Sequence, residues 1–156
     1  MVDFLSSTEK KELLSKLEKY GIEKIPFLLV KSGQEKIRAF SGNLSVDEIR
    51  EISRSVYVEG IGLYFAKIDG EDIRLTVDSL HLLKDQIKHN TLKLTDEQLE
   101  KYLKGQDIEA NQKQLEQINN RKIYFILKHD QDILGMTKIV TKQIRNYLPK
   151  ERRRKH

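Results

Sequence analysis

The sequence predicts an α+β fold in two domains, residues 1–88 and residues 89–156. Two observations lead to this prediction. Helical segments that begin at capping residues alternate along the chain with short β-like runs joined by turn residues. A polar, turn-like stretch, Lys88-His89-Asn90, separates a first half with three helical segments from a second half made mostly of short strands. We place the domain boundary there, since a chain of 156 residues forms one domain or two small ones.

Five elements are predicted in the first half, each marked by a cap or a turn. They are a helix from the Ser6-Ser7-Thr8 cap to Gly21, a hairpin with strands 26–30 and 35–40, a helix after the capping box Ser45–Glu48, a hairpin with strands 61–68 and 71–77, and a helix from Asp78. In the second hairpin, Asp69-Gly70 suits a two-residue type I′ turn. Its first strand is apolar on both faces, which predicts a central strand covered on both sides. Gly60 and Gly62 precede that strand and are interpreted as positions of close backbone approach.

The second half predicts a strand, a helix, a loop and three further strands. They are strand 91–94, a helix from the capping box Thr95–Gln98 to Gly105, a polar loop over 109–120, a hairpin with strands 121–128 and 133–140, and a final basic strand that ends near Pro149, with the residues from Glu151 onward frayed. Short antiparallel strands with one helix are typical of a small mixed β-barrel.

The net charge of +5 is concentrated at the C-terminal end of the chain. Residues 138–156 hold eight of the 29 Lys and Arg residues and one of the 24 Asp and Glu residues, a net charge of +7, which leaves −2 for residues 1–137. Such a segment attracts polyanions, of which a phosphate backbone is the commonest. The alternative is a solubilising, disordered tail. Apolar residues interleaved with the charges favour a strand docked on a core.

The sequence lacks the residue patterns of common enzyme sites. It has no cysteine, which excludes disulfides, thiolate metal sites and cysteine nucleophiles. It has no phosphate-binding glycine motif and no G-x-S-x-G elbow, and its four histidines are scattered. Neither a long apolar window nor a secretory signal is present. We therefore expect a cytoplasmic, non-enzymatic protein without cofactor, metal or membrane segment.

Binding to a polyanion is the better interpretation. Lys101 and Lys104 can share a helix face, and Gly105 after them lets the backbone approach a phosphate or sugar closely, although a plain helix C-cap explains the glycine equally well. Lys138, Lys142 and Arg145 alternate with apolar residues, as on an exposed strand face. Tyr102 and Tyr147 are candidates for stacking on a base, with burial in the core as the alternative for each.

Three ordered motifs resemble a known family. Residues 100–108 (EKYLKGQDI), 133–138 (ILGMTK) and 144–153 (IRNYLPKERR) are similar to a helix end, a hairpin strand and a terminal strand in the PUA-like RNA-binding domain of RsmF-type rRNA cytosine-5 methyltransferases. Met136, Thr137 and Glu151 depart from the pattern of that family. Residues 1–88 resemble, more weakly, the α+β pre-PUA domain that precedes such modules in ribosome-biogenesis factors. Cytosine-5 methylation in the family uses a cysteine nucleophile, so a chain without cysteine resembles the RNA-binding end alone.

The resemblance implies a free-standing protein that binds rRNA, pre-rRNA or tRNA through a PUA-like domain at residues 89–156. The predicted RNA-binding residues share a basic or polar side chain or an open backbone; they are Lys101, Lys104, Gly105, Lys138, Lys142, Arg145, Asn146, Lys150, Arg152 and Arg153. The cations are assigned to phosphates, and Asn146 and the Gly105 backbone to sugar or base edges. The alternatives are an adapter whose first domain docks an RNA methyltransferase or ribosome-assembly factor, and an enzyme of unknown type.

Overall fold

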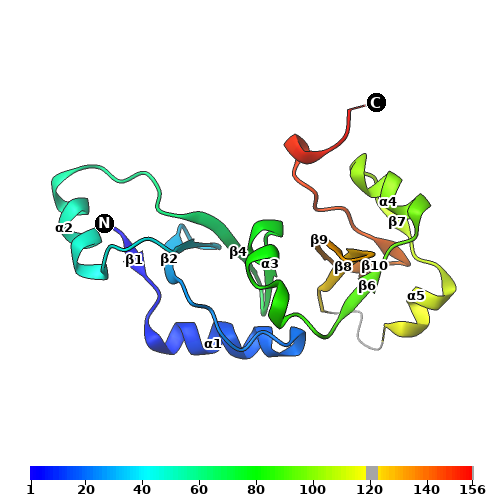
Figure 1. Cartoon of the computed structure of the whole chain (residues 1–156), viewed down its shortest axis with the longest axis horizontal. Helices are drawn as coiled ribbons and strands as arrows, with labels where there is room; N and C mark the ends of the chain where they lie inside the picture. The colour runs from blue at the N-terminus through cyan, green and yellow to red at the C-terminus, as the bar shows by residue number, and fades with distance from the viewer. Residues whose placement is uncertain (119–122, 156) are drawn as a thin grey trace. The chain divides into compact units, whose positions relative to one another are not determined.

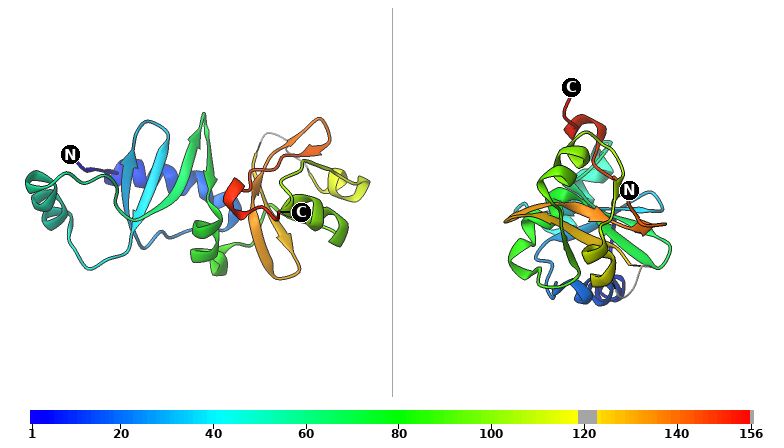
Figure 2. Two further views of the ribbon diagram at one scale, coloured as in Figure 1. Left: turned by 90° about the horizontal axis from the view of Figure 1, so that it is seen from above. Right: turned by 90° about the vertical axis from the view of Figure 1, so that its right-hand side faces the viewer.

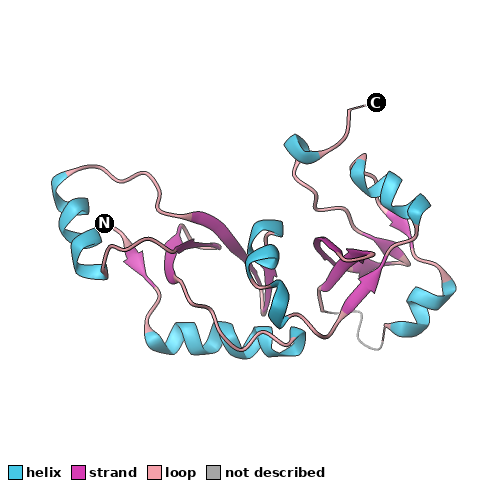
Figure 3. Cartoon of the chain, in the orientation of Figure 1, coloured by secondary structure: helices cyan, strands magenta, loops and turns pink. Residues whose placement is uncertain are grey.

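The computed structural model describes residues 1–118 and 123–155. The chain divides into two compact units, Met1–Ile87 and Lys88–His156. Helices and strands are mixed in both units (Figures 1 and 3), so the α+β class is confirmed. No helix among the described residues is long and apolar enough to cross a membrane.

A five-stranded antiparallel sheet forms the first unit, with neighbouring strands consecutive in sequence. Its strands are β1 (Asp3–Phe4), β2 (Leu28–Ser32), β3 (Lys36–Phe40), β4 (Leu63–Asp69) and β5 (Asp72–Leu75). β4 lies inside the sheet, and its neighbouring residues Phe65 and Ala66, which face opposite sides, are both fully buried. The predicted central strand is confirmed at these residues.

Three helices accompany this sheet, and the first two along the chain start at the predicted caps. They are α1 (Ser7–Leu17), which continues as a 3₁₀ turn to Tyr20 and lies along one face of the sheet (Figures 1 and 2), α2 (Val46–Ser55) and α3 (Val77–Leu82). Ser6 and Ser45 form full capping boxes with Glu9 and Glu48. α3 begins one residue before the predicted start at Asp78, because the Thr76 hydroxyl accepts the Ser79 N–H at 3.3 Å and so caps the helix.

The turn between β4 and β5 differs from the prediction by one position. Asp69 pairs with Asp72, so the two turn residues are Gly70 and Glu71 instead of Asp69 and Gly70. Of these two, only Gly70 has a positive φ, +59°, whereas a type I′ turn needs a positive φ at both central positions. Close backbone approach is confirmed at Gly62, where a Cβ atom would collide with the carbonyl oxygen of Ala39.

Two three-stranded sheets form the second unit, in the orders β10-β11-β7 and β6-β8-β9. The strands are β6 (Thr91–Lys93), β7 (Ile108–Glu109), β8 (Phe125–His129), β9 (Asp132–Thr137), β10 (Ile139–Val140) and β11 (Gln143–Ile144), and the helices are α4 (Asp96–Leu103) and α5 (Gln112–Gln117). β6 and β8 run parallel, so one strand pair departs from the expected antiparallel pairing, and two helices are present where one was expected.

The predicted loop over 109–120 instead holds α5, because Asn111 and Gln114 form a capping box. The end of this predicted loop, Asn119 and Asn120, lies outside the described residues. The same holds for Arg121 and Lys122, which begin the predicted strand 121–128.

The final basic strand is also not a single strand. Thr141 and Lys142 both have positive φ, +50° and +63°, and form a tight turn between β10 and β11. Beyond Pro149, residues Lys150–Arg152 form a 3₁₀ turn. The Arg154 N–H then donates to the carbonyl of Leu103 at 2.8 Å, so the chain that was predicted to fray is attached to the end of α4.

Candidate nucleic-acid interface

The net positive charge of the protein lies in the second unit. Lys88–His156 holds 16 Lys and Arg residues against nine Asp and Glu residues, a net charge of +7, whereas Met1–Ile87 holds 13 against 15, a net charge of −2. The electrostatic field of the second unit therefore attracts polyanions, and that of the first does not.

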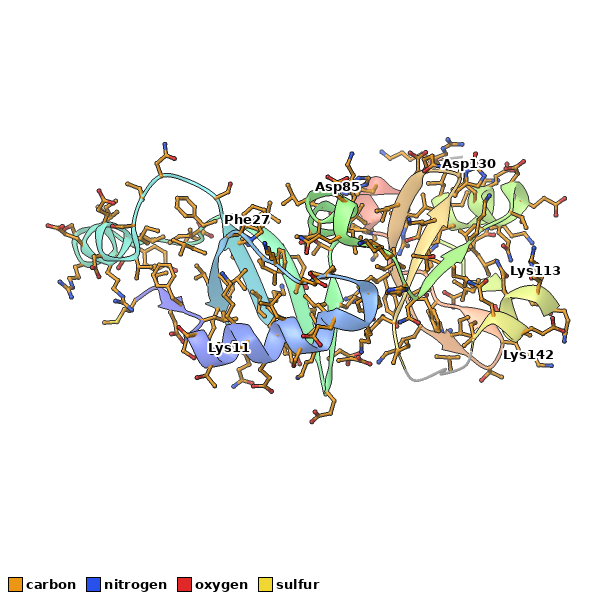
Figure 4. The ribbon with its side chains drawn as sticks, turned by 60° about the horizontal axis from the view of Figure 1, so that its bottom comes forward. Lys11, Phe27, Asp85, Lys113, Asp130 and Lys142 are labelled. Carbon is orange, nitrogen blue, oxygen red and sulfur yellow. The ribbon has the colours of Figure 1, made fainter. Side chains whose placement is uncertain are left out.

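Two of the predicted cations, Lys101 and Lys142, line one groove of the second unit. α4 contributes Lys101, the β10–β11 turn contributes Lys142, and residues of α5 line the groove between them; Figure 4 shows Lys142 close to α5. Both lysines are exposed, and within residues 1–118 and 123–155 neither forms an ion pair. Glu97 and Glu109 also line the groove. The lysines can therefore contact phosphates, while the carboxylates limit where a phosphate can sit.

A buried amide pair fixes α4 against α5 and so shapes this groove. The Gln98 Nε2 donates to Gln114 Oε1 at 2.9 Å, and the Gln114 Nε2 donates to Gln98 Oε1 at 2.8 Å. Each Nε2 also donates to a strand carbonyl, of β7 for Gln98 and of β6 for Gln114, and each Oε1 accepts the N–H of its own N-cap residue. A buried amide network with every group paired specifies one arrangement of the elements that it joins.

Gly105 and Arg153, two predicted RNA-binding residues, are in contact with each other. Gly105 has a φ of +82° and ends α4, with its own N–H and that of Gln106 bonded back to the last turn of the helix. A Cβ atom on Gly105 would collide with the side chain of Arg153. The Arg153 Nε donates to the Leu148 carbonyl at 3.0 Å, which holds the guanidinium there. The close backbone approach predicted at Gly105 is thus made by the protein's own C-terminal segment.

Asn146 lies in a hydrogen-bonded clasp between the C-terminal segment and the end of α4. Its Nδ2 donates to the carbonyls of Tyr102 at 2.8 Å and Gln106 at 2.9 Å, and its Oδ1 accepts the Leu148 N–H at 2.9 Å. These bonds occupy the amide atoms that the sequence analysis assigned to a base or sugar edge.

Arg145 is paired with the same region of the fold. Its Nη1 donates to Asp107 Oδ2 at 2.7 Å. The other oxygen, Oδ1, accepts the Asn146 backbone N–H at 2.8 Å. That backbone hydrogen bond, and then the Arg145 guanidinium, lower the pKa of Asp107 below its ordinary value. Arg145 therefore fixes the strand end through a charge-assisted hydrogen bond.

Lys138 does not line the groove of Lys101 and Lys142. Its ammonium group lies over an aromatic ring. Its Nζ is 4.4 Å from the ring centroid of Tyr124, which is buried. Tyr147 meets the same ring edge-on, with the centroids 6.1 Å apart, and remains 39% exposed. Tyr102 is buried, so the core interpretation holds for Tyr102, while Tyr147 keeps an accessible surface that could stack on a base.

The remaining predicted cations lie at the surface. Lys104 Nζ is 3.5 Å from a carboxylate oxygen of Glu100, four residues earlier on the same face. Lys150 and Arg152 are exposed in the 3₁₀ turn. The structure thus groups the ten predicted residues into a groove pair, Lys101 and Lys142, a clasp, Gly105, Arg145, Asn146 and Arg153, and four separate cations, Lys104, Lys138, Lys150 and Arg152.

Two lysines that sequence reasoning missed line a second groove of this unit. Lys93 and Lys113 lie along it together with Asn111 and His129. Lys113 was missed because α5 was predicted as a loop; the spacing Asn111-x-x-Gln114 is the capping signal that identifies this helix. Lys93 lies in the predicted strand 91–94 and was not singled out there. Among the described residues, no group of three or more His, Cys, Asp or Glu side chains is placed to hold a metal ion.

The comparison with protein families agrees with the motifs quoted from the sequence. Residues 89–154 match the family described as the methyltransferase RsmF PUA domain. No match was found among curated proteins. The matched segment spans α4, α5 and β6 to β11 and contains all ten predicted residues. A PUA domain binds RNA and is not itself catalytic. The C-terminal part of the chain, residues 89–154, is a PUA-like RNA-binding domain related to that of RsmF.

Proposed function

We propose that the protein is a non-catalytic RNA-binding protein that recognises structured rRNA or tRNA, in ribosome biogenesis or RNA modification. The observation that carries the proposal is the coincidence of the PUA-like domain with the unit that holds the net charge of +7. Counterion release from the RNA would then supply a large part of the affinity.

The RNA is proposed to contact four of the cations that the fold leaves exposed. Lys101 and Lys142 in the groove and Lys150 and Arg152 near the C-terminus are assigned to phosphates, and Tyr147 is assigned to a base. Arg145, Asn146, Gly105 and Arg153 are assigned a positioning role, because their side chains or backbone hold the C-terminal segment against α4.

The test compares two variants that change charge equally. Lys101→Glu with Lys142→Glu and Lys150→Glu reverses three exposed cations of the proposed surface. The control, Lys11→Glu with Lys24→Glu and Lys84→Glu, reverses three exposed lysines of the first unit. Arg145 is left intact because of its ion pair with Asp107. Each protein is titrated with a labelled tRNA at salt concentrations between about 50 and 200 mM, and circular dichroism checks the fold.

Four phosphate contacts predict a slope of log K against log salt of about −3 to −4. The surface variant should weaken binding by more than about tenfold and flatten this slope, while the control should stay within about threefold. An equal loss in both variants, or binding that salt does not change, would contradict the proposal. A tRNA should also bind more tightly than an unstructured oligonucleotide of the same length if the domain recognises RNA shape.

A second candidate function is that of an adapter. Here the first unit, which we interpret as a pre-PUA domain, docks an RNA methyltransferase or a ribosome-assembly factor while the PUA-like domain holds the RNA. The exposed apolar side chains in and around α2 favour this candidate, since such patches mark protein-interaction sites.

A further inference from the structure

α2 leaves the C-terminal part of its apolar face uncovered, whereas Val46 in its first turn is half-buried. Ile49 is its one buried residue. Ile52 is 44% exposed, Val56 just after the helix is 55% exposed, and Tyr57 is 92% exposed. Ile49, Ile52 and Val56 fall on one stripe of a helix with 3.6 residues per turn. We call the exposed apolar residues Leu44, Ile52, Val56 and Tyr57 the α2 surface.

The loops that carry α2 are anchored to the sheet at both ends. At the start, the ring of Phe40 packs against Gly42. At the end, Gly62 abuts the Ala39 carbonyl, and the Arg38 Nε donates to the Ile61 carbonyl at 2.9 Å. Figures 1 and 3 show that the chain between β3 and β4 carries α2 beyond the edge of the sheet. The loops therefore hold the helix in position, while Ile52 and Val56 stay exposed.

The two flanks of the stripe differ in charge and in exposure. On one flank, the Arg50 guanidinium lies 5.7 Å from the ring centroid of Phe4 in β1, so this side faces the protein's own first strand. The other flank carries Glu48 and Glu51, and Glu59 follows in the loop; all three are exposed. The Ser45 N–H donates a hydrogen bond to the Glu48 carboxylate and lowers its pKa below the ordinary value. The accessible side of the α2 surface is thus bordered by carboxylates.

We propose that the α2 surface docks a basic amphipathic helix of a partner protein. The apolar side chains of that helix would cover Ile52, Val56 and Tyr57, and its Lys or Arg residues would lie beside Glu48, Glu51 and Glu59. The acidic border and the net charge of −2 on this unit oppose RNA and anionic lipid at the same place. The inference concerns a surface other than the RNA interface and stands without the RNA-binding proposal; it assigns a surface and a partner chemistry to the adapter function.

The test uses the full chain and two designed peptides of about 20 residues, long enough to form helices. Both carry Leu at positions i, i+3, i+4 and i+7; one has Lys and the other Glu at the remaining solvent-facing positions. The Lys peptide should shift the amide resonances of residues 44–59 in a saturable titration and bind at least about tenfold more tightly than the Glu peptide. Ile52→Ser with Val56→Ser should abolish that binding.

Two further variants distinguish binding at this site from nonspecific binding to exposed apolar side chains. Leu82→Ser removes an exposed apolar side chain elsewhere in the same unit and should leave binding unchanged. Glu51→Lys with Glu59→Lys should reverse the preference so that the Glu peptide binds better.

Equal binding of both peptides, or shifts outside residues 44–59, would overturn the proposal. Dimerisation that the Ile52→Ser, Val56→Ser variant abolishes, or binding to anionic vesicles, would assign the surface to a second copy or to lipid and overturn it as well. Binding of tRNA by this variant should equal that of the unmodified chain, which keeps the outcome separate from the RNA proposal.

Discussion

Replacing Asn146 by Ala tests whether this side chain serves the fold or the RNA. The change removes three hydrogen bonds, to the carbonyls of Tyr102 and Gln106 and from the N–H of Leu148. A typical intramolecular hydrogen bond contributes about 1 kcal/mol net, and a buried group left without a partner costs about 1–3 kcal/mol.

The three bonds are not equal. Gln106 is exposed, so water replaces the bond to its carbonyl. The Tyr102 carbonyl still accepts the Gly105 N–H at 2.9 Å after the change. Leu148 is buried, and its N–H loses the partner that the structure provides. The sum gives an expected loss of about 2 kcal/mol in the free energy of unfolding of the second unit.

Urea unfolding, followed by NMR signals of the second unit, measures this loss. Gln131→Ala is the matched control, because it removes an exposed amide from the turn between β8 and β9 and should change stability by less than about 0.5 kcal/mol. Affinity for tRNA, measured where the variant is fully folded, should change little. A stability equal to that of the unmodified chain, together with an affinity reduced about tenfold, would refute the clasp and place Asn146 in the RNA interface.

Three further predictions concern other residues of the second unit. Gly105→Ala should destabilise the second unit by more than about 1 kcal/mol, and adding Arg153→Ala should recover part of the loss, because it removes the collision but not the positive φ; double-mutant urea unfolding measures this coupling. The pKa of Asp107 is lowered in the folded state, so its contribution to stability is present above its unfolded pKa and is lost as the pH falls through the folded value; Asp107→Asn should flatten the acid side of the stability curve. Thr141→Asn should stabilise the protein by about 1 kcal/mol, since asparagine tolerates a positive φ better than threonine, and should leave tRNA affinity unchanged while Lys142→Gly lowers it.

The elements that the sequence predicted well are those set by neighbouring residues. Ser6, Ser45 and Thr95 each cap a helix through groups three residues away, so the signal and the structure occupy the same four positions. α5 was missed although it has the same box, because its cap is Asn111 and its helical residues are almost all polar. Without an apolar stripe, the periodicity that identifies a helix is absent.

These local signals do not predict which residues pair when they are far apart in the sequence. β6 pairs with β8 in parallel, with Thr91 opposite Ile126, and nothing in either strand specifies the direction of its partner. The turn at Thr141-Lys142 is a similar case, since neither residue type favours the positive φ that it adopts. Tertiary contacts impose that turn: the Ala110 N–H donates to the Lys142 carbonyl at 2.9 Å.

The candidate site was predicted as one set of charged and polar residues. In the fold, some of them bond to other residues of the protein, and others lie exposed at the surface. Arg145 is charged in the sequence, but its partner Asp107 lies 38 residues away and becomes visible only in the structure. The ion pair does not reduce the attraction of the unit for RNA at long range, because Asp107 is already counted in the net charge of +7. It does reduce the number of cations that can displace counterions at contact, and the slope of affinity against salt depends on that number. A slope near −3 would therefore count the four contacts of Lys101, Lys142, Lys150 and Arg152 alone, whereas a slope near −5, the value for six contacts, would require the clasp to open and release Arg145 and Arg153 to the RNA.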